Sequence, residues 1–344
     1  MTVTMRALYW DGHELSFNTS YPSPPIRSKI EDREPRIAGT TGSGPAASAN
    51  QTALVKVHLA GICATDLQIF KGYMDFKGVP GHEFVGSVSE GPRELFGKRV
   101  VSEINFGCGK CDSCQRELSR HCRNRSVMGI LNADGAFAEY VSVPTGNLHV
   151  VPENVSDEEA VFTEPLAAAF EILTQIEFNP DDEVLVLGDG KLGNLCAQVL
   201  RLTGAKVTAL GKHPEKLKLI KNSAVRTVLL NDWRPRLFDV VIEATGSASG
   251  LELAISAVRP RGTLVLKSTI ACNHQVSLAP IVINEINVIG SRCGPFPDAL
   301  EALSTRQVSV TPLIEKIYSL NDGLGAVSHA GKPGAKKILL RPSS

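Results

Sequence analysis

A glycine-rich turn between a strand pattern and a helix pattern constrains the fold of this chain most. Residues 183–187 read EVLVL, which is typical of a buried strand, and a helix pattern covers 192–202. Between them stand Gly188, Gly190 and Gly193, in the spacing G-x-G-x-x-G. Gly188 allows a tight turn, Gly190 lets a pyrophosphate approach the helix N-terminus at Lys191 and Leu192, and Gly193 permits close helix–strand packing. This context favours a dinucleotide site over a plain strand–turn–helix.

The sequence around this turn alternates between strand and helix patterns. Strands are predicted at 207–210, 238–244 and 263–267, and helices at 164–176, 214–221 and 250–258. Such alternation predicts an α/β fold with a doubly wound parallel sheet covered by helices.

The chain before about residue 150 is rich in predicted strands rather than in alternating strands and helices. Short strand patterns separated by turn residues are predicted at 53–60, 83–88, 99–104 and 137–143, and the C-terminal part adds a helix near 297–304 and a strand at 337–340. A chain of 344 residues exceeds what one hydrophobic core usually supports, so we expect about two domains. Residues 38–51 are rich in Gly, Ser, Ala and Thr and predict a surface loop.

The charge balance limits the partners of the protein. Thirty-six basic residues match 36 acidic ones. A neutral chain argues against nucleic acid or an anionic membrane as the main partner. The sequence shows neither a long apolar stretch nor an N-terminal signal pattern, so we expect a cytoplasmic protein.

Four cysteines fall within fifteen residues, at Cys108, Cys111, Cys114 and Cys122. Four soft ligands on one turning loop suit tetrahedral zinc better than they suit four unrelated thiols. Because protein would fill all four positions, this zinc site should be structural.

A second candidate metal site combines Cys63 with His82. A catalytic zinc needs three protein ligands and one open position. Two acids are candidates for the third ligand, Glu83 beside His82 and Glu164 at the start of a predicted helix. Considered alone, Cys63 would more often be a buried structural cysteine.

The strand after the glycine turn bears on the choice of cofactor. An NAD site usually ends this strand with an acid that holds the ribose 2′-hydroxyl. Here Gly211 stands at that place and Lys212 follows, with no acid on the strand. A small residue beside a cation favours the 2′-phosphate of NADP, although a merely solvated strand end would accept either cofactor.

Six motifs in order, GICATD, GHEFVG, the four-cysteine lobe, TEPLAAA, GDGKLG and VVIEATG, resemble the zinc-dependent medium-chain dehydrogenase/reductase family, which includes alcohol, sorbitol and threonine dehydrogenases. The resemblance implies a GroES-like, β-rich catalytic domain and a Rossmann cofactor domain. It assigns 1–160 and 298–344 to the catalytic domain, with a zinc lobe at 107–123, and 161–297 to the Rossmann domain.

The resemblance also implies roles for single residues. Cys63 and His82 match catalytic zinc ligands, Glu164 matches the third ligand position, and Glu83 matches a neighbour that binds or approaches the metal. The remaining matches are Thr65 as the proton relay, Asp66 as the acid that orients the zinc-bound histidine, and Lys336 as a cation near the pyrophosphate.

The implied activity is hydride transfer between an alcohol, polyol or sugar and NAD(P), with two zinc ions per chain and NADP favoured over NAD. The implied assembly is a homodimer or homotetramer that pairs through the strand pattern at 286–290. Two alternatives stay open: a zinc-free quinone or enoyl reductase of the same superfamily, and a non-enzymatic nucleotide-binding protein.

Overall fold

The computed structural model describes residues 3–25, 51–220, 225–269 and 275–342. Most of the predicted loop at 38–51, and Cys272, lie outside these residues. The chain forms two compact units: Met1–Glu153 with Tyr318–Ala326 and Leu339–Ser344, and Asn154–Ile317 with Val327–Ile338. Residues 298–317, which the resemblance assigns to the catalytic domain, belong to the second unit under this division. The family's domain boundaries therefore stay a prediction.

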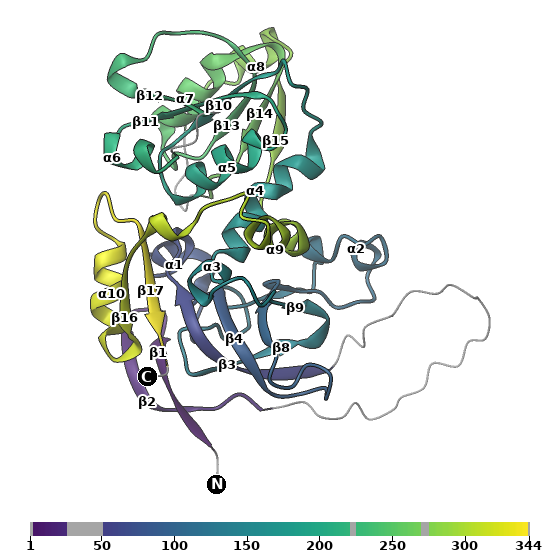
Figure 1. Ribbon diagram of the computed structural model, residues 1–344, viewed down its shortest axis with the longest axis vertical. Coiled ribbons are helices and arrows are strands. Elements are labelled where there is room, and N and C mark those ends of the chain that lie inside the picture. Colours follow the sequence, from purple (N-terminus) through teal and green to yellow (C-terminus); the bar gives the residue numbers. More distant parts are fainter. Residues whose placement is uncertain (1–2, 26–50, 221–224, 270–274, 343–344) are drawn as a thin grey trace, which may run out of the picture. The chain divides into compact units, whose positions relative to one another are not determined.

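The second unit is built on a parallel sheet of six strands in the order β12-β11-β10-β13-β14-β15 (Figure 1). The strands are β10 (Glu183–Leu187), β11 (Lys206–Gly211), β12 (Val225–Leu229), β13 (Phe238–Glu243), β14 (Val258–Leu266) and β15 (Asn287–Gly290). This is the dinucleotide-binding order 3-2-1-4-5-6, in which ligands bind at the carboxyl edge where the order reverses, here between β10 and β13. The α/β prediction is confirmed.

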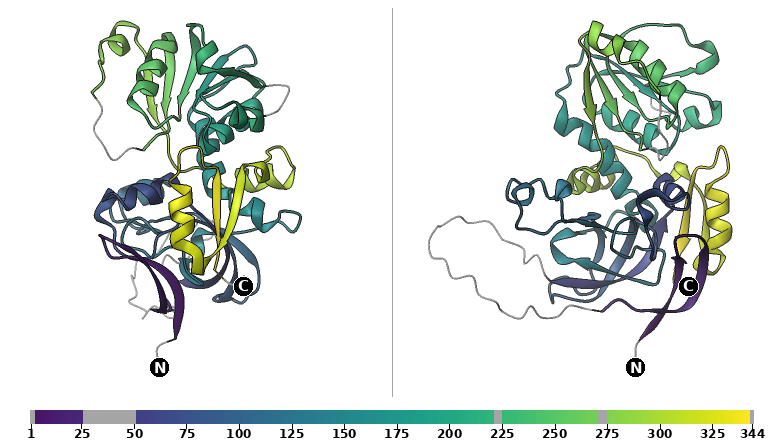
Figure 2. Two further views of the ribbon diagram at one scale, coloured as in Figure 1. Left: turned by 90° about the vertical axis from the view of Figure 1, so that its left-hand side faces the viewer. Right: turned by 180° about the vertical axis from the view of Figure 1, so that it is seen from behind.

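Helices cover this sheet on both faces (Figures 1 and 2). The helix α5 (Lys191–Arg201) packs on β10 and β11, and the short α6 (Pro214–Leu217) packs on β11 and β12. The helix α7 (Ala248–Ala257) packs on β13 and β14 and contacts α8 (Ala279–Ile283). Of the other helices of this unit, α4 (Thr163–Gln175) packs on α5 and on α9 (Phe296–Ser304), and α3 (Asp157–Ala160) contacts α9. Leu185, Val241 and Phe238 are almost fully buried in the core that the sheet shares with α7, as expected for apolar strands covered on both sides.

The first unit is built on an antiparallel sheet. Within this unit its order is β17-β3-β4-β5-β9, and β8 also pairs with β3. The strands are β3 (Thr52–Gly61), β4 (Glu83–Glu90), β5 (Arg99–Ser102), β8 (Tyr140–Pro144), β9 (Leu148–Val150) and β17 (Lys337–Arg341), while most of β16 (Ile314–Ser319) belongs to the second unit. Two small sheets accompany it, the hairpin of β1 (Thr4–Trp10) with β2 (Leu15–Pro22), and β6 (Asn105–Phe106) with β7 (Ser126–Val127). The remaining α-helices are α1 (Ala64–Ile69), α2 (Asp112–Gln115) and α10 (Gly323–Ala330).

The predicted strand at 137–143 begins later than expected, at Tyr140. Residues just before it bond to β1 instead, because the Leu8 N–H donates to the Phe137 carbonyl at 2.8 Å and the Glu139 N–H donates to Arg6 at 3.1 Å. The predicted helix 214–221 is also shorter, since α6 ends at Leu217 and a 3-10 turn follows.

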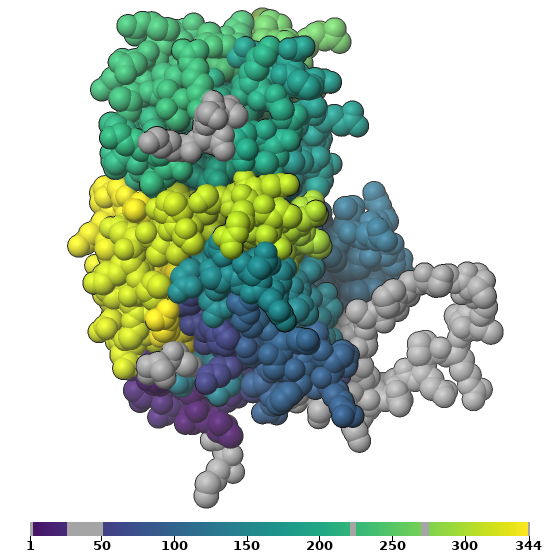
Figure 3. Space-filling view, viewed as in Figure 1, coloured from purple at the N-terminus to yellow at the C-terminus, as the bar shows by residue number. Residues whose placement is uncertain are grey.

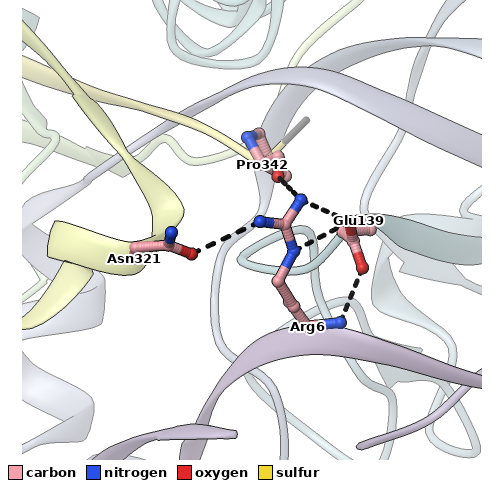
Figure 4. A network of polar contacts seen from close by, with 4 residues as sticks. All are labelled: Arg6, Glu139, Asn321 and Pro342. Carbon is pink, nitrogen blue, oxygen red and sulfur yellow. Dashed lines mark hydrogen bonds and ion pairs between the residues drawn. The ribbon is translucent and has the colours of Figure 1, made fainter. Parts of the chain in front are cut away.

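Arg6 ties both ends of the chain into the first unit (Figure 4). Its Nε and Nη2 donate to Glu139 Oε1 at 3.0 and 2.7 Å, and its backbone N–H donates to Oε2 at 2.7 Å. The guanidinium also donates to Asn321 Oδ1 at 3.5 Å and to the Pro342 carbonyl at 3.4 Å. In Figure 3 the C-terminal residues, in yellow, adjoin the N-terminal hairpin, in purple.

Within the described residues, the helices are too short or too polar to cross a membrane.

Candidate functional site

Cys63, His82 and Glu83 converge in the first unit. One ligand atom from each lies within 4.8 Å of the others. Cys63 precedes α1, while His82 stands just before β4 and Glu83 begins it. The side chains of His82 and Glu83 are buried. A thiolate, an imidazole and a carboxylate are the donors zinc prefers, so this group fits one zinc ion.

Asp66 organises the group from within α1. It is fully buried, and its Oδ2 accepts the backbone N–H of Cys63 at 2.7 Å. Its Oδ1 lies 3.1 Å from His82 Nδ1. A proton on Nδ1 leaves Nε2 with the lone pair that a metal needs. Burial alone would lower the pKa of His82, but the side chains of Asp66 and Cys63 outweigh it and raise that pKa well above its ordinary value.

Thr65 places a hydroxyl beside the same group. Its Oγ1 lies 3.8 Å from Cys63 Sγ. A hydroxyl can both donate and accept, so at this place it can pass a proton to or from an alcohol held near the sulfur.

The four-cysteine lobe also converges. The sulfurs of Cys108, Cys111, Cys114 and Cys122 lie within 4.8 Å of one another. Cys111 Sγ is 3.6 Å from both Cys114 Sγ and Cys122 Sγ, and all four cysteines are free. Tetrahedral zinc with Zn–S bonds of 2.3 Å holds its sulfurs about 3.8 Å apart. The lobe therefore has nearly the dimensions of a closed zinc site.

Two thiols of the lobe, those of Cys108 and Cys114, have pKa values shifted in opposite directions. Backbone N–H groups of Lys110 and Cys111 lower the pKa of Cys108 to about 6. Burial and the neighbouring Cys111 sulfur raise the pKa of Cys114 to about 11. A bound dication would favour the thiolate form of both sulfurs.

The glycine turn has the geometry that its sequence predicts. Gly188 has φ +116°, where glycine is favoured. A Cβ on Gly193 would collide with the Gly188 carbonyl, whereas one on Gly190 would meet no atom within 4 Å. Gly190 caps α5, so the helix N-terminus at Lys191 and Leu192 is open to a phosphate.

The end of β11 differs in one respect from the prediction that no acid stands at this place. Gly211 is buried and Lys212 is exposed. The carboxylate of Asp189, from the glycine turn, accepts the Lys212 N–H at 2.6 Å. The strand itself carries no acid, but the turn supplies one at the same place.

Comparisons with known proteins identify the family of the chain. The model of the alcohol dehydrogenase GroES-like domain matches residues 49–153, and that of zinc-binding dehydrogenase matches 192–306. The sorbitol dehydrogenase of Halalkalibacterium halodurans is 30% identical over 313 residues, which cover 84% of this chain and 91% of the relative.

The chain belongs to the zinc-type medium-chain dehydrogenase family.

Two solved structures of 26% identity extend the match to the whole fold. An alcohol dehydrogenase of Escherichia coli CFT073 complexed with NADH has a TM-score of 0.83, covering 99% of this chain and 100% of that one. A putative zinc-binding dehydrogenase of Sinorhizobium meliloti 1021 bound to NADP has a TM-score of 0.82, with the same coverage. The protein is thus an oxidoreductase that transfers hydride between an alcohol and a nicotinamide cofactor.

Two predicted site residues of the second unit, Glu164 and Lys336, lie outside the glycine turn and the end of β11. Glu164 stands in the first turn of α4. Lys336 donates its backbone N–H to Glu315 at 2.7 Å and its Nζ to the Pro312 carbonyl at 3.3 Å.

Sequence reasoning missed Lys267, which follows β14. This lysine is 6% exposed, and its ammonium donates to the Ala168 carbonyl, Ser291 Oγ and the Arg292 carbonyl at 2.5, 3.0 and 3.2 Å. Burial lowers its pKa. The ammonium thereby fastens α4, which carries Glu164, to the segment after β15. A lysine at a strand end gives no sequence signal for this role.

Proposed function

We propose that the protein oxidises a polyol or another secondary alcohol at a zinc site built on Cys63 and His82. The observation that carries the proposal is the convergence of Cys63, His82 and Glu83, with Asp66 beside His82. The similarity to a sorbitol dehydrogenase supports a polyol over a simple alcohol.

Each residue has a distinct task in this reaction. Zinc, when bound, supplies a Lewis acid that polarises the alcohol oxygen. Cys63 and His82 hold it, with Glu83 or Glu164 as third ligand, and Asp66 fixes the ring of His82. Thr65 carries the hydroxyl proton away, and nicotinamide supplies the hydride acceptor.

A second zinc ion is proposed in the cysteine lobe. Its support is the position of Cys111 Sγ, which lies 3.6 Å from both Cys114 Sγ and Cys122 Sγ. Because four sulfurs complete a tetrahedron, this ion would hold the loop in shape and take no part in hydride transfer. Zinc thiolates of this kind also suit the reducing cytoplasm, which is the location we propose.

The proposed cofactor is NADP rather than NAD. Its support is Lys212, an exposed cation directly after β11, which is opposed there by the carboxylate of Asp189. The pyrophosphate is proposed to lie at Lys191, Leu192 and Gly193 of α5, with Lys336 as a further cation.

A homo-oligomer is proposed through the edge of the parallel sheet. β15 is the last strand in the sheet order. Beside it Val282 and Ile283 of α8 are 74% and 77% exposed, and Val288 of β15 is 43% exposed. A second copy related by a two-fold axis would extend the sheet and cover these apolar side chains.

A substrate panel tests the proposed activity. Purified protein is assayed with polyols of four to six carbons, simple alcohols and sugars, each with NAD and NADP in parallel. We expect polyol-dependent reduction of the nicotinamide, and loss of it in Cys63→Ser but not in Cys293→Ser, a cysteine outside both metal clusters. A zinc-free wild-type protein that turns over at full rate would overturn the proposal.

A further inference from the structure

Asp189 fills the place that a strand-end acid occupies in NAD sites. It is the residue between Gly188 and Gly190, yet its side chain reaches the end of the neighbouring strand β11. Its Oδ2 accepts the backbone N–H groups of Lys212 and His213 at 2.6 and 2.7 Å. The ring Nδ1 of His213 lies 3.0 Å from the same oxygen, and the Asp189 side chain is only 9% exposed.

Gly211 and Asp189 exclude one another's side chains. A Cβ on Gly211 would lie 2.5 Å from both Cβ and Oδ2 of Asp189. An acid at 211 therefore cannot coexist with Asp189 in its present position. The glycine at the strand end leaves room for a carboxylate that comes from the turn.

The carboxylate is ionised and keeps some accepting capacity. Burial alone would raise the pKa of Asp189, but His213 and the backbone N–H groups of His213 and Lys212 lower it below its ordinary value. Oδ2 accepts two N–H groups, and Oδ1 has one nitrogen nearby, His213 Nδ1 at 3.1 Å. A carboxylate offers about four acceptor sites, so one can still receive a ribose hydroxyl.

We propose that Asp189 is a specificity-determining residue of the adenosine ribose site. It accepts from the 2′-hydroxyl of NAD and repels the 2′-phosphate of NADP, while Lys212 attracts that phosphate. Cofactor preference is then set by the opposition of these two neighbouring charges. This inference rests on the proposed function, because it requires that a nicotinamide cofactor binds at the glycine turn.

Calorimetric titration of wild type and Asp189→Asn with NAD and with NADP tests the inference without any substrate. Asparagine keeps the size of the side chain and one oxygen acceptor for the turn, but it removes the charge. We expect the ratio of NAD to NADP dissociation constants to rise about tenfold in favour of NADP, as for the loss of one partly screened like charge. The direction holds whichever cofactor the wild type prefers.

Two further variants sharpen the test. Asp189→Ala combined with Gly211→Asp moves the carboxylate from the turn to the strand and should return the ratio to within about threefold of wild type. Lys212→Ala should move the ratio toward NAD. Thermal unfolding of each variant shows whether the unit remains folded.

The outcomes separate the two claims. Wild type that binds neither cofactor would overturn the proposed function. Wild type that binds either one, with a folded Asp189→Asn variant whose ratio is unchanged, would overturn the role of Asp189 and leave the proposed function standing.

Discussion

Oδ1 of Asp66 lies 3.1 Å from Nδ1 of His82, and both side chains are buried. The same carboxylate accepts the N–H of Cys63 through its other oxygen at 2.7 Å. One acid on α1 thus fixes a sulfur ligand and an imidazole ligand that stand nineteen positions apart in the sequence.

Asp66→Asn is expected to lower zinc affinity at the Cys63 site by about ten- to a hundredfold, since partners of ligating histidines contribute that much. Competition with a chelating dye measures it. The exposed Asp75→Asn is the matched control. Unchanged affinity in Asp66→Asn would show that His82 does not depend on Asp66 for its orientation.

Elemental analysis is expected to find about two zinc ions per wild-type chain and about one in Cys111→Ser or Cys63→Ser. The two losses should differ in consequence. Cys111→Ser should lower the melting temperature, because the lobe loses the ion that joins its sulfurs, whereas Cys63→Ser should mainly lose activity. Equal zinc content in all three proteins would contradict both metal assignments.

Glu139→Gln is expected to lower the free energy of unfolding by about 1 kcal/mol, because the partly exposed Arg6 loses its charged acceptor. The pKa of Glu139 is lowered from 4.5, because Arg6 outweighs the effect of burial. The contribution of the pair is thus present above about pH 4.5 and is lost as the pH falls through the lower native pKa. Denaturant unfolding at several pH values should show the two proteins converging in acid. A difference in unfolding free energy that stays constant across these pH values would contradict the ion pair.

Lys267→Met is expected to cost about 2 kcal/mol of unfolding free energy, because it removes the donor to the buried Ser291 Oγ and to the partly buried carbonyls of Ala168 and Arg292. Lys206→Met is the matched control, since Lys206 pairs with Asp181 on the surface and its loss should change stability far less. Urea unfolding compares them. Equal stability of both variants would show that the Lys267 ammonium is not needed to fasten α4.

Val288→Lys is expected to convert the proposed oligomer to a smaller species, because a lysine on an edge strand opposes pairing with a second copy. Light scattering at micromolar concentration measures the mass. Leu324→Lys, at a 46% exposed leucine on α10, should leave the mass unchanged. A monomeric wild type would contradict the proposed assembly.

Local sequence patterns predicted most strands of the parallel sheet, but they did not predict the contacts that irregular segments make. The apolar runs at β10 and β13 predicted buried strands, because strands covered on both faces need continuous apolar residues. The hairpin strand β2 was missed, since its burial is partial and irregular. Residues 137–139 were predicted to begin the strand at 137–143, but they bond to β1, far away in the sequence, and the strand begins at Tyr140.

The sequence likewise predicted one part of the candidate sites and missed another. Spacing predicted the cysteine lobe, because soft ligands at short intervals have few other uses. The Cys63–His82 group was predicted from the ligand types in its two motifs and from the family resemblance. The sequence did not predict that Asp189 would stand at the end of β11. A side chain that crosses from one turn to the next strand leaves no periodic signal, and only the collision of a Gly211 Cβ with Asp189 reveals it.

The most direct test of the account is the rate of nicotinamide reduction by wild type and Cys63→Ser, each with its zinc content, on the polyol that the wild type oxidises best. Zinc-loaded wild type should turn over, lose activity when a chelator removes zinc, and recover when zinc is restored. Cys63→Ser, still folded and holding the zinc of the cysteine lobe, should be at least about a hundredfold slower. Full activity in Cys63→Ser with only that one zinc would contradict the assignment of the catalytic site.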